Sequence, residues 1–291
     1  MKEKSLNQEN LEEDKFLEYQ ETSLLIENVK EEAVKAEIFD KSFLNDLNFH
    51  FMADFKKEGD NFNTYEVKSD GSMEIIDDEN MPIGSDKDVY VFSKSFYKID
   101  GWLSDDFGKE FYNKEELNER IISKSFIENT DFNLLYSFDS IVAHEIAHAK
   151  SFGLIPLKSD NFNHNKFENQ IKEIIKNDLI LQKINDVDFN KYFFNIREWS
   201  EIYALLYQRE FLRRKDSSNE IKIKEWDNRI FYVADNLNAI AKEKSEKLNK
   251  DMKPNLIYGD CHTFSYLLAN PLERKFENFD DRIKFLESFK K

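Results

Sequence analysis

The chain has 291 residues, enough for one large domain or two smaller ones, and its 58 acidic and 42 basic residues give a net charge of −16. This charge argues against nucleic acid as a partner, because phosphate binding requires a basic surface. The single cysteine, Cys261, excludes an internal disulfide and favours a reducing compartment.

The sequence contains no recognisable signal for secretion or for membrane insertion. The first ten residues lack the apolar stretch of a secretory signal, and no apolar run approaches the ~20 residues that span a bilayer. We therefore expect a soluble cytoplasmic protein without a membrane partner, while specialised export would leave no mark. With only 7 glycines and 4 prolines, the fold class we expect is α+β and predominantly helical.

The N-terminal segment, residues 1–58, is expected to be helical. Apolar residues between Leu6 and Lys57 recur at three- and four-residue intervals, which is the helical period. Such a stripe most often packs on the body of the same protein. Residues 59–291 then form the unit that is expected to hold the functional site.

A small sheet is predicted over residues 62–98, where short β-prone runs alternate with turn signals. Thr64–Val67 and Met73–Ile76 flank Asp70 and Gly71, a dipeptide that is typical of hairpin turns. Val89–Phe92 is the strongest strand prediction.

After Asn113 the sequence predicts an almost wholly helical chain. Apolar periodicity places helices at residues 114–128, 134–152, 166–184, 196–215, 221–250, 256–269 and 271–289. Asn270 and Pro271 predict the break between the last two, because a proline disfavours helix in the residue before it. His262, which follows Asp260 and Cys261, is expected to be structural, since three consecutive residues converge poorly on one ion.

The most informative segment is the pattern H-E-x-x-H at residues 144–148. Residues four apart lie on one face of a helix, so His144 and His148 can bind a single metal ion. Glu145 is offset toward the side where a water would lie. In this pattern the glutamate acts as a general base and is not a ligand.

The surrounding sequence predicts that this helix is buried. Residues 134–152 are mostly apolar at helical spacing, and Gly153 and Pro156 predict its end. Buried histidines must be hydrogen-bonded or bound to a metal, so metal binding would satisfy both of them.

The pattern resembles the zincin metallopeptidases, in which zinc takes three protein ligands and keeps one position for water. The third ligand separates the subfamilies. The metzincin pattern needs glycine and histidine where this chain has Ser151 and Leu154. For the aspzincin pattern Asp160 lies at about the right distance, but the residues that precede it do not match.

A glutamate on a later helix, as in the gluzincins, is the better match. The apolar helix predicted over residues 196–215 carries both Glu198 and Glu201. In several gluzincin-like families a small residue follows the ligand by three positions, and Ala204 has that offset from Glu201. Glu201 is therefore the preferred ligand and Glu198 the alternative, and the other glutamate is expected to orient a ligand histidine.

The resemblance is to the zincin core, over about the central third of the chain, and no narrower family is matched. The second acid of the thermolysin-like pattern is replaced by Ile202 or Leu205, depending on which glutamate is the ligand. The implied architecture is a zincin-like catalytic core with the small sheet before the histidine helix and a helical C-terminal half.

The implied activity is that of a zinc-dependent metalloendopeptidase with one Zn²⁺. Glu145 would accept the proton of a water activated by the metal and pass it to the leaving amine. An oxyanion is usually stabilised by a tyrosine or histidine donor, and Tyr192, Tyr203 and Tyr207 are the candidates on or near the third-ligand helix.

The implied partner is a peptide or protein substrate. In zincin-like folds an edge strand binds an extended peptide through backbone hydrogen bonds, and Tyr90–Ser95 is the candidate strand here. The alternative is a catalytically silent zincin-like protein that binds metal and acts as a regulatory or interaction protein. Glu145 favours catalysis, because a silent site has no evident need for that carboxylate.

Overall fold

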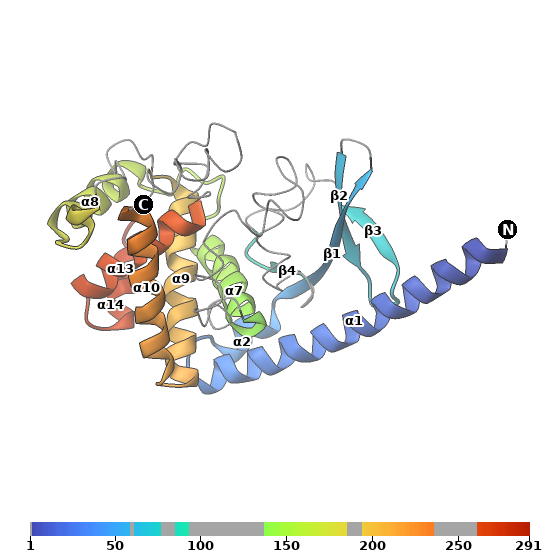
Figure 1. Cartoon of the computed structure of the whole chain (residues 1–291). Coiled ribbons are helices and arrows are strands. Elements are labelled where there is room, and N and C mark those ends of the chain that lie inside the picture. The colour runs from blue at the N-terminus through green and yellow to red at the C-terminus, as the bar shows by residue number, and fades with distance from the viewer. Residues whose placement is uncertain (1, 59–60, 77–84, 93–136, 185–193, 236–260) are drawn as a thin grey trace, which may run out of the picture.

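The computed structural model describes residues 2–58, 61–76, 85–92, 137–184, 194–235 and 261–291. The fold is α+β and predominantly helical, as the sequence predicts. Figure 1 shows the small sheet on one side, most of the helices on the other, and helix α7 between them. Within these ranges, no helix combines the length and apolar character that a membrane span requires.

The described elements have the following bounds. They are α1 (Lys2–Lys35), α2 (Lys41–Asn45), β1 (Asn48–Glu58), β2 (Asn61–Val67), β3 (Met73–Ile76), β4 (Asp88–Phe92), α7 (Phe138–Leu154), α8 (His164–Asn177), the 3-10 helix η1 (Leu181–Lys183), α9 (Ile196–Lys215), α10 (Asn219–Asp235), α13 (Cys261–Lys275) and α14 (Phe279–Glu287).

The four strands form one sheet in the order β3-β2-β1-β4. Strands β1, β2 and β3 are antiparallel neighbours, whereas β4 runs parallel to β1. The predicted hairpin turn is confirmed, since Gly71 has a φ of 84° in the left-handed region that favours glycine. Its amide donates a 2.9 Å hydrogen bond to the carbonyl of Lys68.

Strand β1 corrects the prediction that residues 48–58 are helical. A spacing of four, as between Leu47, Phe51 and Phe55, places residues on one side of a strand as well as on one face of a helix, because four is also a multiple of two. Phe51 and Met52 are both buried on adjacent positions, so both faces of this central strand are covered.

His50 on β1 connects three strands of the sheet. Its Nδ1 lies 2.8 Å from Glu66 Oε1 on β2, and its Nε2 lies 2.9 Å from Asp88 Oδ1 on β4. Burial by itself lowers the pKa of His50, but the hydrogen bonds and charges of Asp88 and Glu66 outweigh it and raise that pKa above its usual value. Tyr90 stacks on the imidazole at 4.8 Å.

Helix α1 packs on the body through its C-terminal half, as expected for the apolar stripe. Ile26, Val29 and Ala33 are buried in the core, whereas Leu17 and Leu24 are exposed. The N-terminal half of the helix extends past the sheet (Figure 1).

Helix α9 is the centre of the helical half and packs against α7, α10, α13 and α14. The predicted break at Pro271 is wrong, because α13 continues through this residue to Lys275. Burial of Leu267, Leu268 and Leu272 around it offsets the cost of about 3 kcal/mol of a proline inside a helix. The break comes instead before Asn278, whose side chain caps α14.

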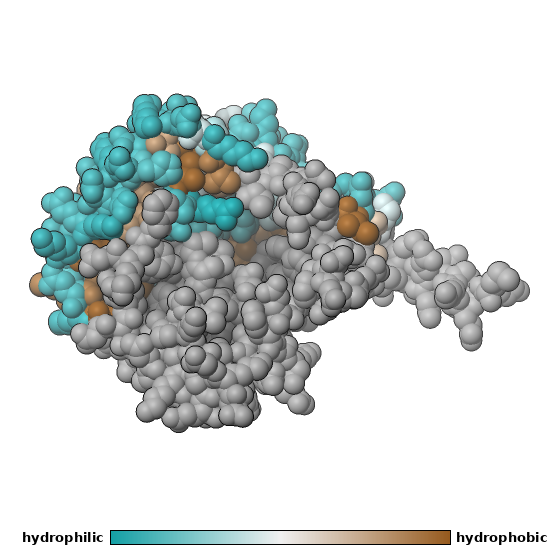
Figure 2. All heavy atoms as spheres, turned by 90° about the horizontal axis from the view of Figure 1, so that it is seen from above, coloured by the Kyte–Doolittle hydropathy of each residue, from teal (hydrophilic) through white to brown (hydrophobic). Residues whose placement is uncertain are grey.

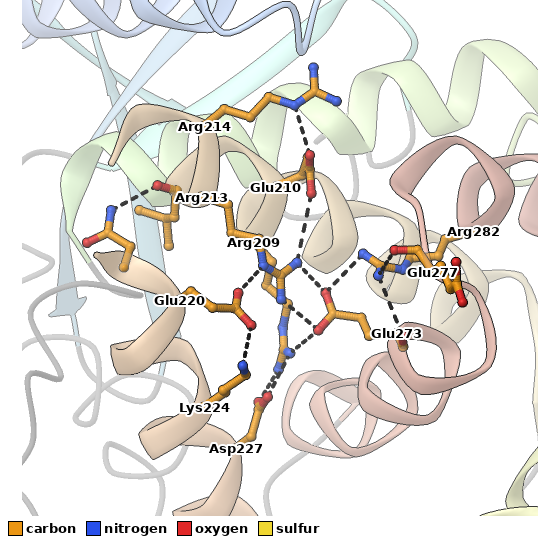
Figure 3. A network of polar contacts seen from close by, with 12 residues as sticks. Arg209, Glu210, Arg213, Arg214, Glu220, Lys224, Asp227, Glu273, Glu277 and Arg282 are labelled. Atoms are coloured by element: carbon orange, nitrogen blue, oxygen red, sulfur yellow. Dashed lines mark hydrogen bonds and ion pairs between the residues drawn. The ribbon is translucent and has the colours of Figure 1, made fainter. Parts of the chain in front are cut away.

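On the face that Figure 2 shows, the described surface of the helical half is mostly hydrophilic. Between α9, α10 and α13, however, a network of charges is buried (Figure 3). Fully buried Arg209 donates to Asp227 and to Glu273, which also accepts from Arg213. Burial raises the pKa of Glu273, but the two guanidinium groups outweigh it and hold that pKa at about 2, so its carboxylate stays charged.

Candidate metal centre

Helix α7 carries the H-E-x-x-H pattern and begins where its sequence allows capping. The hydroxyl of Ser137 accepts a hydrogen bond from the amide of Ser140, and Asp139 lies in the first turn, where a negative charge is favourable. The helix includes Gly153 and ends at Leu154, shortly before Pro156. Its end therefore lies two residues beyond the predicted one.

Helix α9 has the predicted bounds, residues 196–215. Asn195 caps it, and Glu198 completes a capping box by accepting a 3.0 Å hydrogen bond from the amide of Asn195. Three basic residues in the last turn oppose the negative end of the helix dipole.

The packing of α7 on α9 brings His144, His148 and Glu201 together. Nε2 of His144 lies 3.4 Å from Glu201 Oε2, and Nε2 of His148 lies 3.3 Å from Glu201 Oε1. The two Nε2 atoms are 3.0 Å apart. The side chains of His144, His148 and Glu201 are only 8%, 15% and 12% exposed.

These three donor atoms could hold a metal ion. With metal–ligand bonds of 2.0–2.1 Å, two corners of a tetrahedral zinc site are about 3.3 Å apart. The two Nε2 atoms are 3.0 Å apart, and they lie 3.4 and 3.3 Å from different oxygens of the Glu201 carboxylate, so these separations are close to that edge. Two imidazole nitrogens and one carboxylate oxygen are also a donor set that zinc accepts, with a fourth position left for another ligand.

Glu145 lies on the same helix turn as the two histidines and is partly exposed. Three residues before His148, it lies about 60° around the helix from that residue, on the flank of the histidine pair. Glu145 is not one of the three residues whose donor atoms converge.

Glu198 does not share the role of Glu201. Its carboxylate binds the amide of Asn195 at the start of α9, so it caps the helix and does not orient a histidine, as had been expected of the glutamate that is not a ligand. Burial raises the pKa of Glu198, and the charge of Glu201 acts in the same direction, against the backbone hydrogen bonds that lower it.

Two serines contact His148 in place of Glu198. Nδ1 of His148 lies 2.8 Å from the hydroxyl of Ser200, which lies 2.7 Å from the hydroxyl of Ser151. Ser151 in turn donates a 2.8 Å hydrogen bond to the carbonyl of His148. This role was not predicted, although Ser151 follows His148 by three residues on the same helix and Ser200 directly precedes Glu201.

The tyrosines proposed to stabilise an oxyanion have other surroundings. The Tyr203 hydroxyl lies 3.4 Å from that of Tyr207 and 3.5 Å from Glu287 Oε1 on α14. Tyr203 is also about 200° around α9 from Glu201, so it faces away from the histidines. Burial raises the pKa of Tyr207 to about 12. Tyr192 lies outside the described residues.

Other sequence candidates lie apart from the three donors. Asp160 is exposed, and exposed His164 is the first residue of α8. The side chain of His262 lies outside the described part of the chain, as does Asp260. Among the described residues, one group of three His, Cys, Asp or Glu side chains is placed to share a metal ion, and it consists of His144, His148 and Glu201.

Comparison with known proteins found no relative of this chain. No family model matches the chain, and neither a curated protein nor a solved structure matches it.

Proposed function

We propose that this chain is a zinc-dependent metallopeptidase that hydrolyses peptide bonds. The observation that carries the proposal is the convergence of His144, His148 and Glu201, with Glu145 beside them on α7. The resemblance of residues 144–148 to the zincins supports the same activity. We also propose that the protein works in a reducing compartment, because its single cysteine cannot form an internal disulfide.

Zinc is the metal that we propose for this site. The donors are two imidazole nitrogens and a carboxylate, a set found in catalytic zinc sites with three protein ligands. When bound, zinc would supply Lewis-acid chemistry, lowering the pKa of a water and polarising a carbonyl. His144, His148 and Glu201 would hold it between α7 and α9.

Glu145 is the proposed general base. Its partly exposed carboxylate would accept a proton from the attacking water as the new carbon–oxygen bond forms. It would then deliver that proton to the nitrogen of the peptide bond that breaks, so that the amine leaves neutral. This role needs a carboxylate beside the donors but outside their set, and the position of Glu145 one residue after His144, outside the group of three, supports it.

An extended peptide is the proposed substrate. Strand β4 packs against α7, and among the described strands it has only β1 as a neighbour. A peptide that pairs with the other side of β4 would gain backbone hydrogen bonds without a required side-chain sequence. Residues 90–92 of the candidate strand lie in β4, whereas residues 93–95 lie outside the described chain.

The test combines metal analysis with peptide cleavage. Purified wild-type protein should contain about one zinc per chain and cleave a mixture of fluorogenic peptides. Glu145→Gln should keep its zinc and lose at least about 100-fold in rate, the usual contribution of a general base. Exposed Glu173 on α8 offers the same chemical change as a control, and Glu173→Gln should behave as wild type.

Each other result decides against part of the proposal. Stoichiometric zinc with no cleavage by the wild type would indicate a metal-binding protein without peptidase activity. Equal cleavage by the wild type and Glu145→Gln would remove Glu145 as the base. Absence of zinc and of cleavage together would reject the function.

A further inference from the structure

We propose that Ser200 and Ser151 are positioning residues that hold His148 in the tautomer with the proton on Nδ1. This leaves the lone pair of Nε2 directed at the other two donors. The inference rests on the proposed metal site, but it concerns two side chains that lie outside the donor set and can be tested in metal-free protein.

The two hydroxyls form a chain of three hydrogen bonds that begins and ends on His148. The chain runs from Nδ1 to the Ser200 hydroxyl at 2.8 Å, from there to the Ser151 hydroxyl at 2.7 Å, and from there to the His148 carbonyl at 2.8 Å. Both serines are buried, with exposed fractions of 1% and 0%. Water therefore does not compete for these hydrogen bonds, and each buried hydroxyl needs its partners.

The direction of the chain follows from the number of protons available. A carbonyl only accepts, so the one proton of the Ser151 hydroxyl goes to the carbonyl of His148. Ser151 must then accept from Ser200, which uses the one proton of the Ser200 hydroxyl. Ser200 must therefore accept a hydrogen bond, and within the described part of the chain the group that donates to it is Nδ1–H of His148.

A fixed Nδ1–H determines what the other ring nitrogen can do. In a neutral imidazole one nitrogen carries the proton and the other is an acceptor, so Nε2 of His148 keeps its lone pair. That atom lies 3.0 Å from Nε2 of His144 and 3.3 Å from Glu201 Oε1. Stacking of Phe152 on the ring, at 5.9 Å and 13°, holds the same orientation.

If Ser200 and Ser151 only linked the two helices, their replacement would not change the tautomer of His148. Serines between two helices often only link them, and Ser140 is such a residue, because its hydroxyl accepts from Gln208 of α9 and donates to the carbonyl of Ser137. Ser140 is as buried as Ser151 and lies on the same helix. It does not contact His148, so Ser140→Ala is the matched control.

The experiment measures the tautomer of His148 in metal-free protein by long-range ¹⁵N–¹H correlation with labelled histidine. In the wild type and in Ser140→Ala, His148 should carry its proton on Nδ1. Ser200→Ala should populate both tautomers, and Ser200→Thr, which retains the hydroxyl, should restore the wild-type spectrum. Ser151→Ala leaves the Ser200 proton without its acceptor, so Ser200 can donate to Nδ1 and the Nε2–H form should gain population.

Zinc affinity, measured by competition with a chromophoric chelator, is the second readout. Ser200→Ala should bind zinc about 10- to 100-fold more weakly than the wild type, the usual effect of removing a partner of a ligand histidine. Ser140→Ala should bind as the wild type does. Circular dichroism establishes that each variant is folded, and if Ser200→Ala is not, Ser151→Ala and Ser200→Thr decide the question.

Two results would overturn the inference. One is a wild-type protein in which His148 carries its proton on Nε2, and the other is a Ser200→Ala variant that matches Ser140→Ala in tautomer and in zinc affinity. Failure of the peptidase proposal is separate, because the tautomer is read without metal or substrate. A protein that binds zinc but does not cleave peptides would leave the roles of both serines intact.

Discussion

The carboxylate of Glu201 on α9 lies 3.4 Å from Nε2 of His144 on α7, so the donor set exists only where these two helices pack together. Fully buried alanines occur on both helices, among them Ala147 and Ala204. Small side chains at a contact allow a close approach of helix axes. The short distance between the donors therefore depends on the core as much as on the donors themselves.

Replacing the two glutamates of α9 separately should distinguish a ligand from a helix cap. Glu201→Ala should lose stoichiometric zinc, because it removes one of three donors. Glu198→Ala should keep zinc and lose about 1 kcal/mol of stability, because it removes one partner of the capping box. Zinc content by mass spectrometry and urea unfolding measure the two effects. The reverse pattern of zinc loss would assign the ligand to Glu198.

Zinc should stabilise the folded chain, because the unfolded chain does not bring α7 and α9 together. At a free zinc concentration 100 times the dissociation constant, the gain is about 2.7 kcal/mol. Thermal unfolding of protein dialysed against a chelator, with and without added zinc, should show this as a rise in Tm. His148→Ala removes a donor and should abolish the response, and a response that survives in this variant would indicate binding elsewhere.

The stability of the sheet should have a pH optimum that is set by His50 and by the carboxylates of Glu66 and Asp88. The pKa of His50 is raised, so its contribution is complete below its unfolded value of 6.5 and is lost as the pH rises through the higher folded value. The pKa values of Glu66 and Asp88 are lowered from 4.5 and 3.8, so their contribution is lost as the pH falls through the folded values. Lys68 and Tyr90 keep one charge state in this interval, since their pKa values are raised from 10.5 and 10.0.

Urea unfolding of the wild type and His50→Gln across pH tests this arrangement. The difference in stability should be largest between about pH 4.5 and 6.5 and should decline above that interval. A difference that is constant from pH 5 to 9 would mean that the charge of His50 does not stabilise the sheet. Lys172→Gln, which changes a partly exposed ion pair on α8, is expected to show no such profile.

The buried charge network should be essential to the helical half. Arg209→Met would remove the guanidinium that binds both oxygens of buried Asp227 and one of the partners of Glu273. Breaking a buried ion pair in this way typically costs about 3–5 kcal/mol. Lys172→Met removes a partly exposed pair with Glu168 and should cost about 0.5 kcal/mol or less. Equal losses in urea unfolding would contradict a structural role for the network that Figure 3 shows.

Local signals in the sequence predicted much of the secondary structure correctly. Apolar periodicity predicted the bounds of α9, and the dipeptide of Asp70 and Gly71 predicted the hairpin. Two predictions were wrong where local signals are ambiguous or are overridden. The four-residue spacing around Phe51 suits a strand as well as a helix, and the burial of leucines around Pro271 keeps α13 intact.

The sequence by itself determined the pair of histidines and the position of Glu145, because four residues of helix fix their relative placement. It narrowed the third donor to two glutamates on one predicted helix. Only the tertiary structure brought Glu201 to the histidines and placed Ser200 against His148, whereas the contact of Glu198 with the amide of Asn195 lies within the first turn of α9. The reason is physical: contacts within one turn follow from helix geometry, whereas contacts between α7 and α9 depend on how two distant segments rotate and pack in a shared core.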